Sequence, residues 1–397
     1  MRMMMKTPIA ATAAATCKVW ARSTAPCEFG RSIYESLRTS NGEHTIAPDP
    51  SALQPLSPSY HCDRMLVDFE EKGDGSVVLT TVAENSGRRT ATSITTDKIT
   101  KHRGIPLGRA SDCPTLTPRA LEDDKFDRRR RPFVSLAVVG IVVIGDDKEN
   151  ENETRFTSSE DGTNTTYVLI TRRPSYMRSF PGAFVFPGGN VDADDESLGH
   201  ALSREIMEET GLEVAAGSWK LECLWESIYP TQLPLLVETE ATATNTAKDI
   251  DEIPQDGAIK AHHLVCYFSG RPQNGDAQKQ QHQQQMSKPC LKLCEEEVDG
   301  AVWMSRNNIR DMLEVTAQIE SNDDHGLPET AKQQTIALHT AISDSTKQDS
   351  FIPLSDLAGI YPCLDETNNR FCGMAQGSLF ALEEFVRNEN RNESKHK

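Results

Sequence analysis

Three glutamates at helical spacing are the residues of this chain best suited to metal chemistry. Glu205, Glu208 and Glu209 lie in the stretch 198–210, which is rich in helix formers and predicts a helix. At this spacing the side chains project from one side of a helix, where exposed like charges repel by roughly 0.2–0.5 kcal/mol per pair. A divalent cation would turn this repulsion into binding. Because Mg²⁺ prefers hard oxygen ligands and leaves positions for substrate phosphates, we expect Mg²⁺, or Mn²⁺, at this site.

Glycines stand on both sides of the predicted helix. Gly188 and Gly189 follow the short apolar run 184–187, which we expect to pack as a strand, and they allow the backbone to approach a ligand closely. Gly211 follows the helix and favours the left-handed conformation that ends one. The acidic loop 192–196 connects the glycine pair to the helix. The stretch therefore predicts a strand, a close-approach loop and a metal-binding helix in succession.

The stretch 186–212 resembles the Nudix box, G-x5-E-x7-R-E-U-x-E-E-x-G-U, in which U is a bulky apolar residue. Arg204 and Glu205 match its R-E pair, and Glu208 and Glu209 match its E-E pair. The metal-binding half of the box is therefore intact, and a match of this length is far more specific than a glycine-rich loop alone.

One position departs from the box. Its glycine would fall on Asn190, so the loop between Gly189 and Glu196 carries one extra residue. Glu196 matches the early acid of the box, and the neighbouring Asp195 is the alternative. In the family this acid usually supports the loop, and we expect Arg204 to brace it.

The resemblance implies hydrolysis of a phosphoanhydride in a nucleoside diphosphate linked to another moiety. Glu208 is our assignment for the general base that activates water, although family members differ in which acid takes this role. The resemblance also assigns as metal ligands Glu205, Glu208, Glu209 and the Gly188 carbonyl, and as structural support Gly189, Glu196, Arg204 and Gly211.

Short motifs outside the box resemble one branch of the family, the nucleoside diphosphate-linked moiety X motif 17 subfamily. Members of that subfamily are similar to hydrolases that remove methylated 5′ caps from RNA. The resemblance therefore implies a nucleotide-containing pyrophosphate substrate, with capped RNA as one candidate. The motifs are LITRR at 169–173, LWESIYP at 224–230, HHLVCYF at 262–268, VWMS at 302–305 and FAL at 380–382.

Four side chains outside the box are candidates for substrate contact. Arg172 and Arg173 stand at the exit of a predicted strand, where they would meet phosphate. Trp225 and Tyr229 are candidates to stack on a base, with a core role as the alternative. Two other functions remain open. One is hydrolysis of small metabolites (nucleotide sugars, coenzyme A, NADH or oxidised nucleotides). The other is a catalytically silent binding module, whose mark would be the loss of a box glutamate, and none is lost.

Composition indicates a soluble acidic protein. The chain has 397 residues and a net charge of −17, and it contains no apolar run long enough to predict a membrane span. Its ten scattered cysteines suit free thiols in a reducing compartment, so we expect a cytoplasmic protein. The alternative is an organelle, because residues 1–27 lack acids, as a transit peptide to the mitochondrion or plastid does. The oligomeric state stays open.

The strands and helices predicted around these residues indicate the α+β fold class. The expected architecture is the Nudix fold, a mixed β-sheet sandwiched between helices, with a small β-rich region before it. Polar insertions, notably 238–256 and the Gln-rich 271–289, are expected to lack structure. The predicted units are a disordered or targeting extension at 1–27, the β-rich region at 28–110, a linker at 111–131 that ends in Arg128–Arg131, the Nudix domain at 132–345, and a C-terminal strand and helix extension at 346–397.

Overall fold

The computed structural model describes residues 19–21, 25–27, 32–39, 62–73, 76–82, 93–96, 99–110, 133–145, 166–177, 179–229, 261–273, 288–321, 334–340, 350–358, 363–365 and 370–395. Most of the predicted N-terminal extension, the linker with Arg128–Arg131, the insertion 238–256 and most of 271–289 lie outside these residues. The predictions made for those segments therefore remain predictions.

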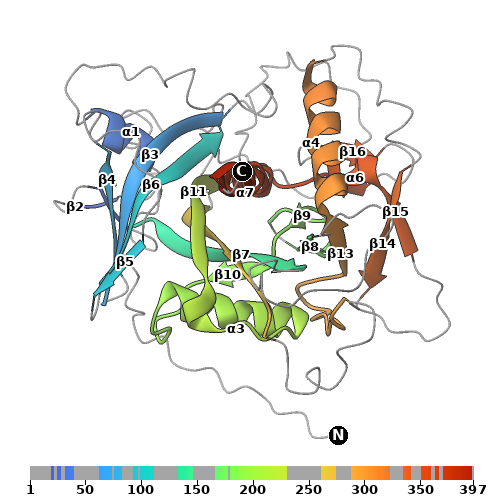
Figure 1. Ribbon diagram of the computed structural model, residues 1–397, viewed down its shortest axis with the longest axis horizontal. Coiled ribbons are helices and arrows are strands. Elements are labelled where there is room, and N and C mark those ends of the chain that lie inside the picture. The colour runs from blue at the N-terminus through green and yellow to red at the C-terminus, as the bar shows by residue number, and fades with distance from the viewer. Residues whose placement is uncertain are drawn as a thin grey trace, which may run out of the picture.

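One mixed sheet runs through the described part of the molecule (Figure 1). Its strand order is β15-β14-β13-β8-β7-β12-β11-β6-β3-β4-β1-β2, with β10 on β7, β9 on β8 and β5 on β6. The strands are β1 (Val19–Ala21), β2 (Ala25–Pro26), β3 (Cys62–Lys72), β4 (Val77–Thr81), β5 (Ser93–Thr96), β6 (Ile99–Ala110), β7 (Ser135–Ile144), β8 (Tyr167–Arg172), β9 (Phe184–Val185), β10 (Gly188–Asn190), β11 (Lys220–Tyr229), β12 (Ala261–Gly270), β13 (Gly300–Ser305), β14 (Thr335–Thr340) and β15 (Ser350–Pro353).

Helices cover both faces of this sheet. The helices are α1 (Ile33–Thr39), α3 (Leu198–Thr210), α4 (Arg306–Ser321), α6 (Leu354–Ala358) and α7 (Gln376–Lys395), with a short 3₁₀ turn, η2 (Ala216–Ser218). A separate two-stranded hairpin consists of β16 (Cys363–Asp365) and β17 (Arg370–Cys372). The expected sandwich of a mixed sheet between helices is confirmed.

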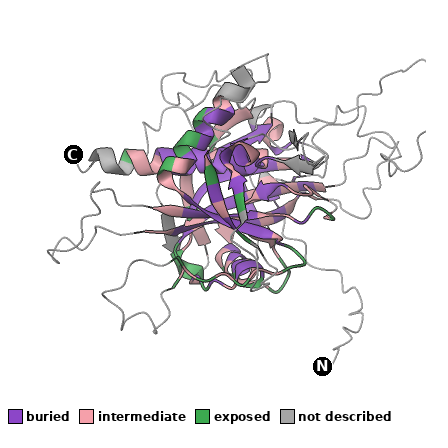
Figure 2. Ribbon diagram, turned by 90° about the vertical axis from the view of Figure 1, so that its right-hand side faces the viewer, coloured by how far each residue is buried: buried purple, intermediate pink, exposed green. Residues whose placement is uncertain are grey.

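Two apolar cores fill the space between the sheet and its helices, because neighbouring residues of a strand face opposite sides. Ile141 of β7 belongs to the core beneath α4 and α7, whereas Val142 belongs to the core beneath α1 and α3. Figure 2 shows that the buried residues are concentrated in the sheet and on the inward sides of the helices. The central strands are therefore fixed from both faces, which gives the site a rigid support.

The N-terminal strands and the C-terminal helix that the structure describes are integral to this fold. The β-rich region that we expected before the Nudix domain continues the same sheet, because β6 pairs in parallel with β11 at Leu107 and Leu224. The helix expected within a C-terminal extension is α7, and it buries Leu379, Phe380 and Phe385 in the core above β6 and β11. None of the described helices is long and apolar enough to cross a membrane.

Candidate active site

Helix α3 holds the predicted metal-binding residues, and it has the predicted bounds. It begins after Ser197, whose hydroxyl accepts a hydrogen bond from the N–H of His200 at 3.1 Å. It ends at Gly211, which has φ 71° and donates its N–H to Met207 O at 3.0 Å. Its buried apolar face packs on β7, and its carboxylates lie at the edge of that face, beside the glycine pair of β10. The side-chain cap and the glycine end explain why this stretch forms a helix with such well-defined ends.

Glu205 and Glu209 lie between the helix and the glycine strand β10. The Gly188 N–H donates to Glu209 Oε2 at 3.1 Å, and Gly189 lies directly against the Glu205 carboxylate. Burial raises the pKa of Glu209 to about 8, although the Gly188 N–H opposes that rise. Burial also raises the pKa of Glu205, and Arg204 opposes it. These environments disfavour two bare negative charges.

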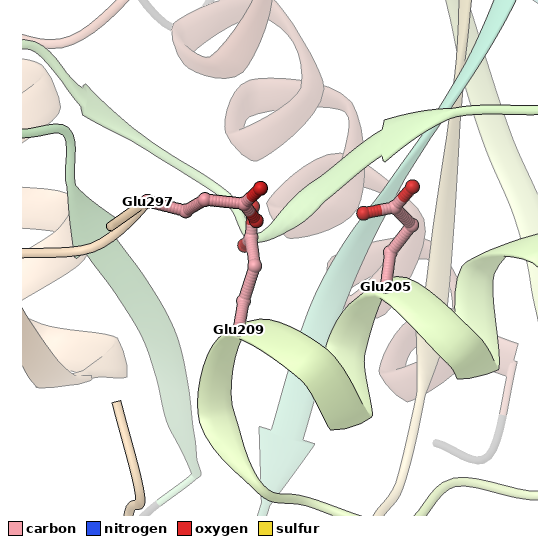
Figure 3. A group of neighbouring side chains, drawn as sticks. All are labelled: Glu205, Glu209 and Glu297. Atoms are coloured by element: carbon pink, nitrogen blue, oxygen red, sulfur yellow. The ribbon is translucent and has the colours of Figure 1, made fainter. Parts of the chain in front are cut away.

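Glu297 completes the carboxylate group, and the sequence interpretation did not identify it. One side-chain oxygen from each of Glu205, Glu209 and Glu297 lies within 4.8 Å of the other two (Figure 3). Glu297 comes from a turn far along the chain, just before β13. The one sequence signal is the acidic run EEE at 295–297, which precedes the VWMS motif, and no spacing connects it to the box.

These residues fit a hard divalent cation. Three carboxylates supply oxygen donors of the kind that Mg²⁺, Mn²⁺ and Ca²⁺ prefer, and no sulfur or imidazole belongs to the group. A buried carboxylate is costly unless it is paired or binds a metal, and Glu209 is 6% exposed. The donor set therefore suits the predicted class of metal.

Glu208 lies apart from this group. Its side chain is exposed and forms an ion pair with Arg204, Nη1 to Oε2, at 3.2 Å. The spacing of the three glutamates predicted that Glu208 would share their side of the helix. Its side chain instead turns toward Arg204. The structure therefore brings together two of the three predicted glutamates and replaces the third with Glu297.

Arg204 braces the acidic loop through Asp195 rather than through the expected Glu196. The Arg204 guanidinium contacts Asp195 at 3.0 and 3.2 Å, and the Asp195 side chain is 3% exposed, whereas Glu196 is exposed. Burial alone would raise the pKa of Asp195, but the hydrogen bonds from Arg204 and from the Asp192 N–H outweigh it and lower that pKa. The extra loop residue shifts the supporting acid by one position, which corrects the assignment of Glu196.

The two arginines predicted to contact substrate have different partners. Arg172 forms an ion pair with Asp299, Nε to Oδ1, at 2.6 Å, and Arg173 donates from Nε to Ser179 O at 3.1 Å. The positive charge of Arg173 also acts on Glu209, whose pKa it lowers against the dominant effect of burial. Both arginines are half-buried at the end of β8, and Arg173 is the one whose charge reaches the carboxylate group.

Trp225 is a core residue, which corrects its assignment to base stacking. It is 5% exposed, and its ring lies 5.3 Å from that of Phe380 on α7. The motif around it is aromatic because the sheet packs against α7 there. Tyr229 ends β11, and its side chain lies outside what the structure describes.

His262 is likewise structural. It is fully buried, and its Nε2 lies 3.0 Å from Glu226 Oε1. Glu226 in turn accepts hydrogen bonds from the N–H groups of Ile33 at 2.6 Å and Tyr34 at 3.1 Å, at the start of α1. This polar group ties the N-terminal region to β11 and β12, away from the carboxylates.

Residues 156–323 match the model of the NUDIX domain. The match spans the carboxylate helix, the glycine strand and the turn of Glu297, and the chain is a Nudix hydrolase with the α+β Nudix fold.

Named relatives within that family are similar to this chain. The chain is similar to the m7GpppN-mRNA hydrolase NUDT17 of Danio rerio, at 27% identity over 283 residues, 70% of this chain and 76% of that protein. It is also similar to the m7GpppN-mRNA hydrolase NUDT17 of Homo sapiens, at 26% identity over 227 residues, 56% of this chain and 58% of that protein. A MutT/nudix family protein from Enterococcus faecalis is similar at 14% identity and a TM-score of 0.29, covering 64% of this chain and 61% of that one. The family assignment rests on the domain match.

Proposed function

We propose that this Nudix hydrolase cleaves a phosphoanhydride in a nucleotide-containing pyrophosphate and requires Mg²⁺ or Mn²⁺. The observation that carries this proposal is the meeting of Glu205, Glu209 and Glu297 beside the glycine strand. When bound, the cation would neutralise phosphate oxygens and orient the attacking water. The Gly188 carbonyl, implied by the family resemblance, is our proposed further ligand.

The remaining residues of the site have separable roles. Arg173 is the proposed phosphate contact, because it is half-buried and its charge acts on Glu209. Arg172 is already paired with Asp299 and serves chiefly to fix the turn that follows Glu297. Arg204 and Asp195 hold the loop in front of the helix. Glu208 is exposed at the rim and remains our proposed proton acceptor, a role that Glu208→Gln tests directly.

A methylated 5′ cap on RNA is the leading substrate. Both relatives described above bear the name m7GpppN-mRNA hydrolase, and the longer of the two alignments covers 70% of this chain. The short motifs outside the box lie in β8, β11, β12, β13 and α7, so the similarity reaches well beyond the catalytic helix. Small nucleotide pyrophosphates are the second candidate, because the carboxylate group by itself selects a phosphoanhydride and not the group attached to it.

The test is a substrate panel with product analysis. Purified full-length protein, with Mg²⁺ or Mn²⁺ and with chelator as a control, is incubated with m7G-capped RNA, NADH, coenzyme A and nucleotide sugars. We expect release of methylated GDP or GMP from capped RNA to be faster than hydrolysis of the other compounds. If a small compound were cleaved rapidly while the RNA cap stayed intact, the proposed reaction class would stand and the proposed substrate would be wrong. Glu209→Gln, which keeps the size of the side chain and removes its charge, should nearly abolish turnover of any compound that is cleaved.

A further inference from the structure

Tyr176 reaches from the connection between β8 and β9 to the turn that carries Glu297. Its hydroxyl donates to Glu295 O at 2.8 Å and to Glu296 O at 3.2 Å. The side chain is 68% exposed, so core packing does not account for its position. We propose that Tyr176 is a positioning residue, whose hydroxyl holds this turn so that the Glu297 carboxylate meets Glu205 and Glu209.

The turn is fixed at its two ends by the backbone. At its start, the Cys294 N–H donates to Glu209 O at 3.0 Å, at the end of α3. After it, the Asp299 N–H donates to Arg172 O at 3.0 Å, at the end of β8. Within it, the N–H of Glu297 donates to Cys294 O at 3.0 Å. Tyr176 acts between these anchors, on the carbonyls of the two residues that directly precede Glu297.

Electrostatics explains why such a restraint matters. One oxygen from each of the three carboxylates lies within 4.8 Å of the others, and Glu295 and Glu296 add two more acids to the same turn. Without a cation, any charge on these carboxylates opposes the position of the turn beside helix α3. A hydroxyl that bonds to two consecutive carbonyls opposes that movement without adding a positive charge. It therefore pre-organises the site and lowers the cost of binding the cation.

This role rests on the proposed function, in which Glu297 is a metal ligand. Tyr176 acts through the backbone of Glu295 and Glu296, so removal of its hydroxyl should weaken metal binding more than substrate binding. Its ring is exposed and its hydrogen bonds lie at the surface, so that removal should affect folding little. These two expectations separate positioning from a general structural role.

The experiment compares Tyr176→Phe with Tyr34→Phe in the full-length protein. Tyr34 is a matched control because its hydroxyl also donates to a backbone carbonyl, Arg64 O, at 3.1 Å, in the N-terminal region. Mn²⁺ binding to the substrate-free protein is measured by electron paramagnetic resonance, together with thermal unfolding. Where a substrate is cleaved, kcat and KM are measured as a function of Mn²⁺ concentration.

For Tyr176→Phe we expect the Kd for Mn²⁺ to rise about 2- to 10-fold, the effect that corresponds to one hydrogen bond. The KM for substrate and the unfolding temperature should stay at wild-type values, and saturating Mn²⁺ should restore kcat. Tyr34→Phe should leave Mn²⁺ binding unchanged.

Wild-type Mn²⁺ affinity in Tyr176→Phe would overturn the inference, and so would an effect confined to KM, which would place the hydroxyl against substrate instead. Failure of the proposed metal site would give a different result. If Glu209→Gln bound Mn²⁺ as well as the wild-type protein, the proposed metal site itself would be wrong, and the inference would fail with it.

Discussion

Gly189 lies so close to Glu205 that a β-carbon at residue 189 would stand 2.6 Å from the carboxylate carbon of Glu205. At the neighbouring Gly188 the close atoms belong to the backbone and not to a side chain. It has φ 150°, and a β-carbon there would stand 2.2 Å from the carbonyl oxygen of Val138, in the paired strand β7. One glycine therefore makes room for a functional side chain, and the other makes room for the sheet.

These two glycines predict opposite outcomes for the same substitution. In Gly189→Ala the obstacle is the end of a flexible side chain, so Glu205 should move aside. We expect turnover to fall by about 10- to 100-fold, as a small misplacement of a catalytic group does, with little change in stability. In Gly188→Ala the obstacle is backbone at a positive φ, so we expect a loss of at least about 1–3 kcal/mol of stability. Thermal unfolding and metal-dependent hydrolysis of both variants check this contrast, and equal unfolding temperatures would contradict it.

Glu297 should behave as a metal ligand, and its neighbour should not. Glu297→Gln removes a charge from the carboxylate group, whereas Glu296→Gln removes a charge from the same exposed turn outside it. We expect Glu297→Gln to weaken Mn²⁺ binding by at least about 10- to 100-fold, the loss that the outer partners of metal ligands already cause. The measurement is titration with Mn²⁺ alone. Equal losses in the two variants would mean that the turn contributes only general negative charge.

Helix α3 and the glycine strand could be predicted because their signals are local. Ser197 and Gly211 mark the two ends of the helix, and the carboxylate spacing defines one face of it. Glu297 could not be found in this way, because no spacing links it to the box and only the fold of β13 against β8 brings its turn back. A hydrogen bond such as that of Tyr176 to the same turn has no sequence signal at all.

Two errors have related physical causes. Asp195 replaced Glu196 because one extra loop residue changes which acid meets Arg204, and the number of residues does not reveal the path of a loop. Trp225 was assigned in part to substrate because an aromatic residue in a strand looks the same in sequence whether it faces a ligand or a helix. Its contact with Phe380 depends on α7, which comes from the far end of the chain.

Glu226 should be among the most important polar residues for stability. It is 1% exposed, contacts His262 and accepts the first N–H groups of α1, so its removal leaves several buried polar groups unpaired. We expect Glu226→Ala to cost about 3–5 kcal/mol of unfolding free energy, because several buried groups lose the acceptor that they share, at about 1–3 kcal/mol for each unsatisfied group. Chemical denaturation measures this cost, and a change of under about 1 kcal/mol would show that the cluster contributes little.

The pH dependence of this contribution has a definite sign. Burial by itself would raise the pKa of Glu226, but His262 and the N–H groups of α1 lower it below its usual value of 4.5. A carboxylate whose pKa is lowered by folding stabilises the protein above its unfolded pKa, and the contribution is lost as the pH falls through the folded pKa. The stability difference between wild type and Glu226→Gln should therefore shrink below about pH 4.5.

The arginine run Arg128–Arg131 offers a way to separate an RNA substrate from a small nucleotide. The chain as a whole carries a charge of −17, so an RNA backbone would have to meet a local basic segment. The run precedes β7 in the sequence and lies outside the described residues, so this prediction rests on composition alone. A solvated charge run with no ligand is the alternative.

Replacement of these four arginines by glutamine should weaken the binding of capped RNA and spare small compounds. We expect a higher KM for capped RNA and a shallower dependence of that KM on salt. The logarithmic slope should fall by up to about 0.7 for each single-strand phosphate that the variant no longer neutralises. Hydrolysis of a small pyrophosphate should change little, because the proposed site for its phosphates consists of the carboxylate group and Arg173. The measurement is kcat/KM for both substrates over a range of KCl concentrations. An equal loss for both substrates would place the run at the active site, and no loss for either would assign it to the solvated surface.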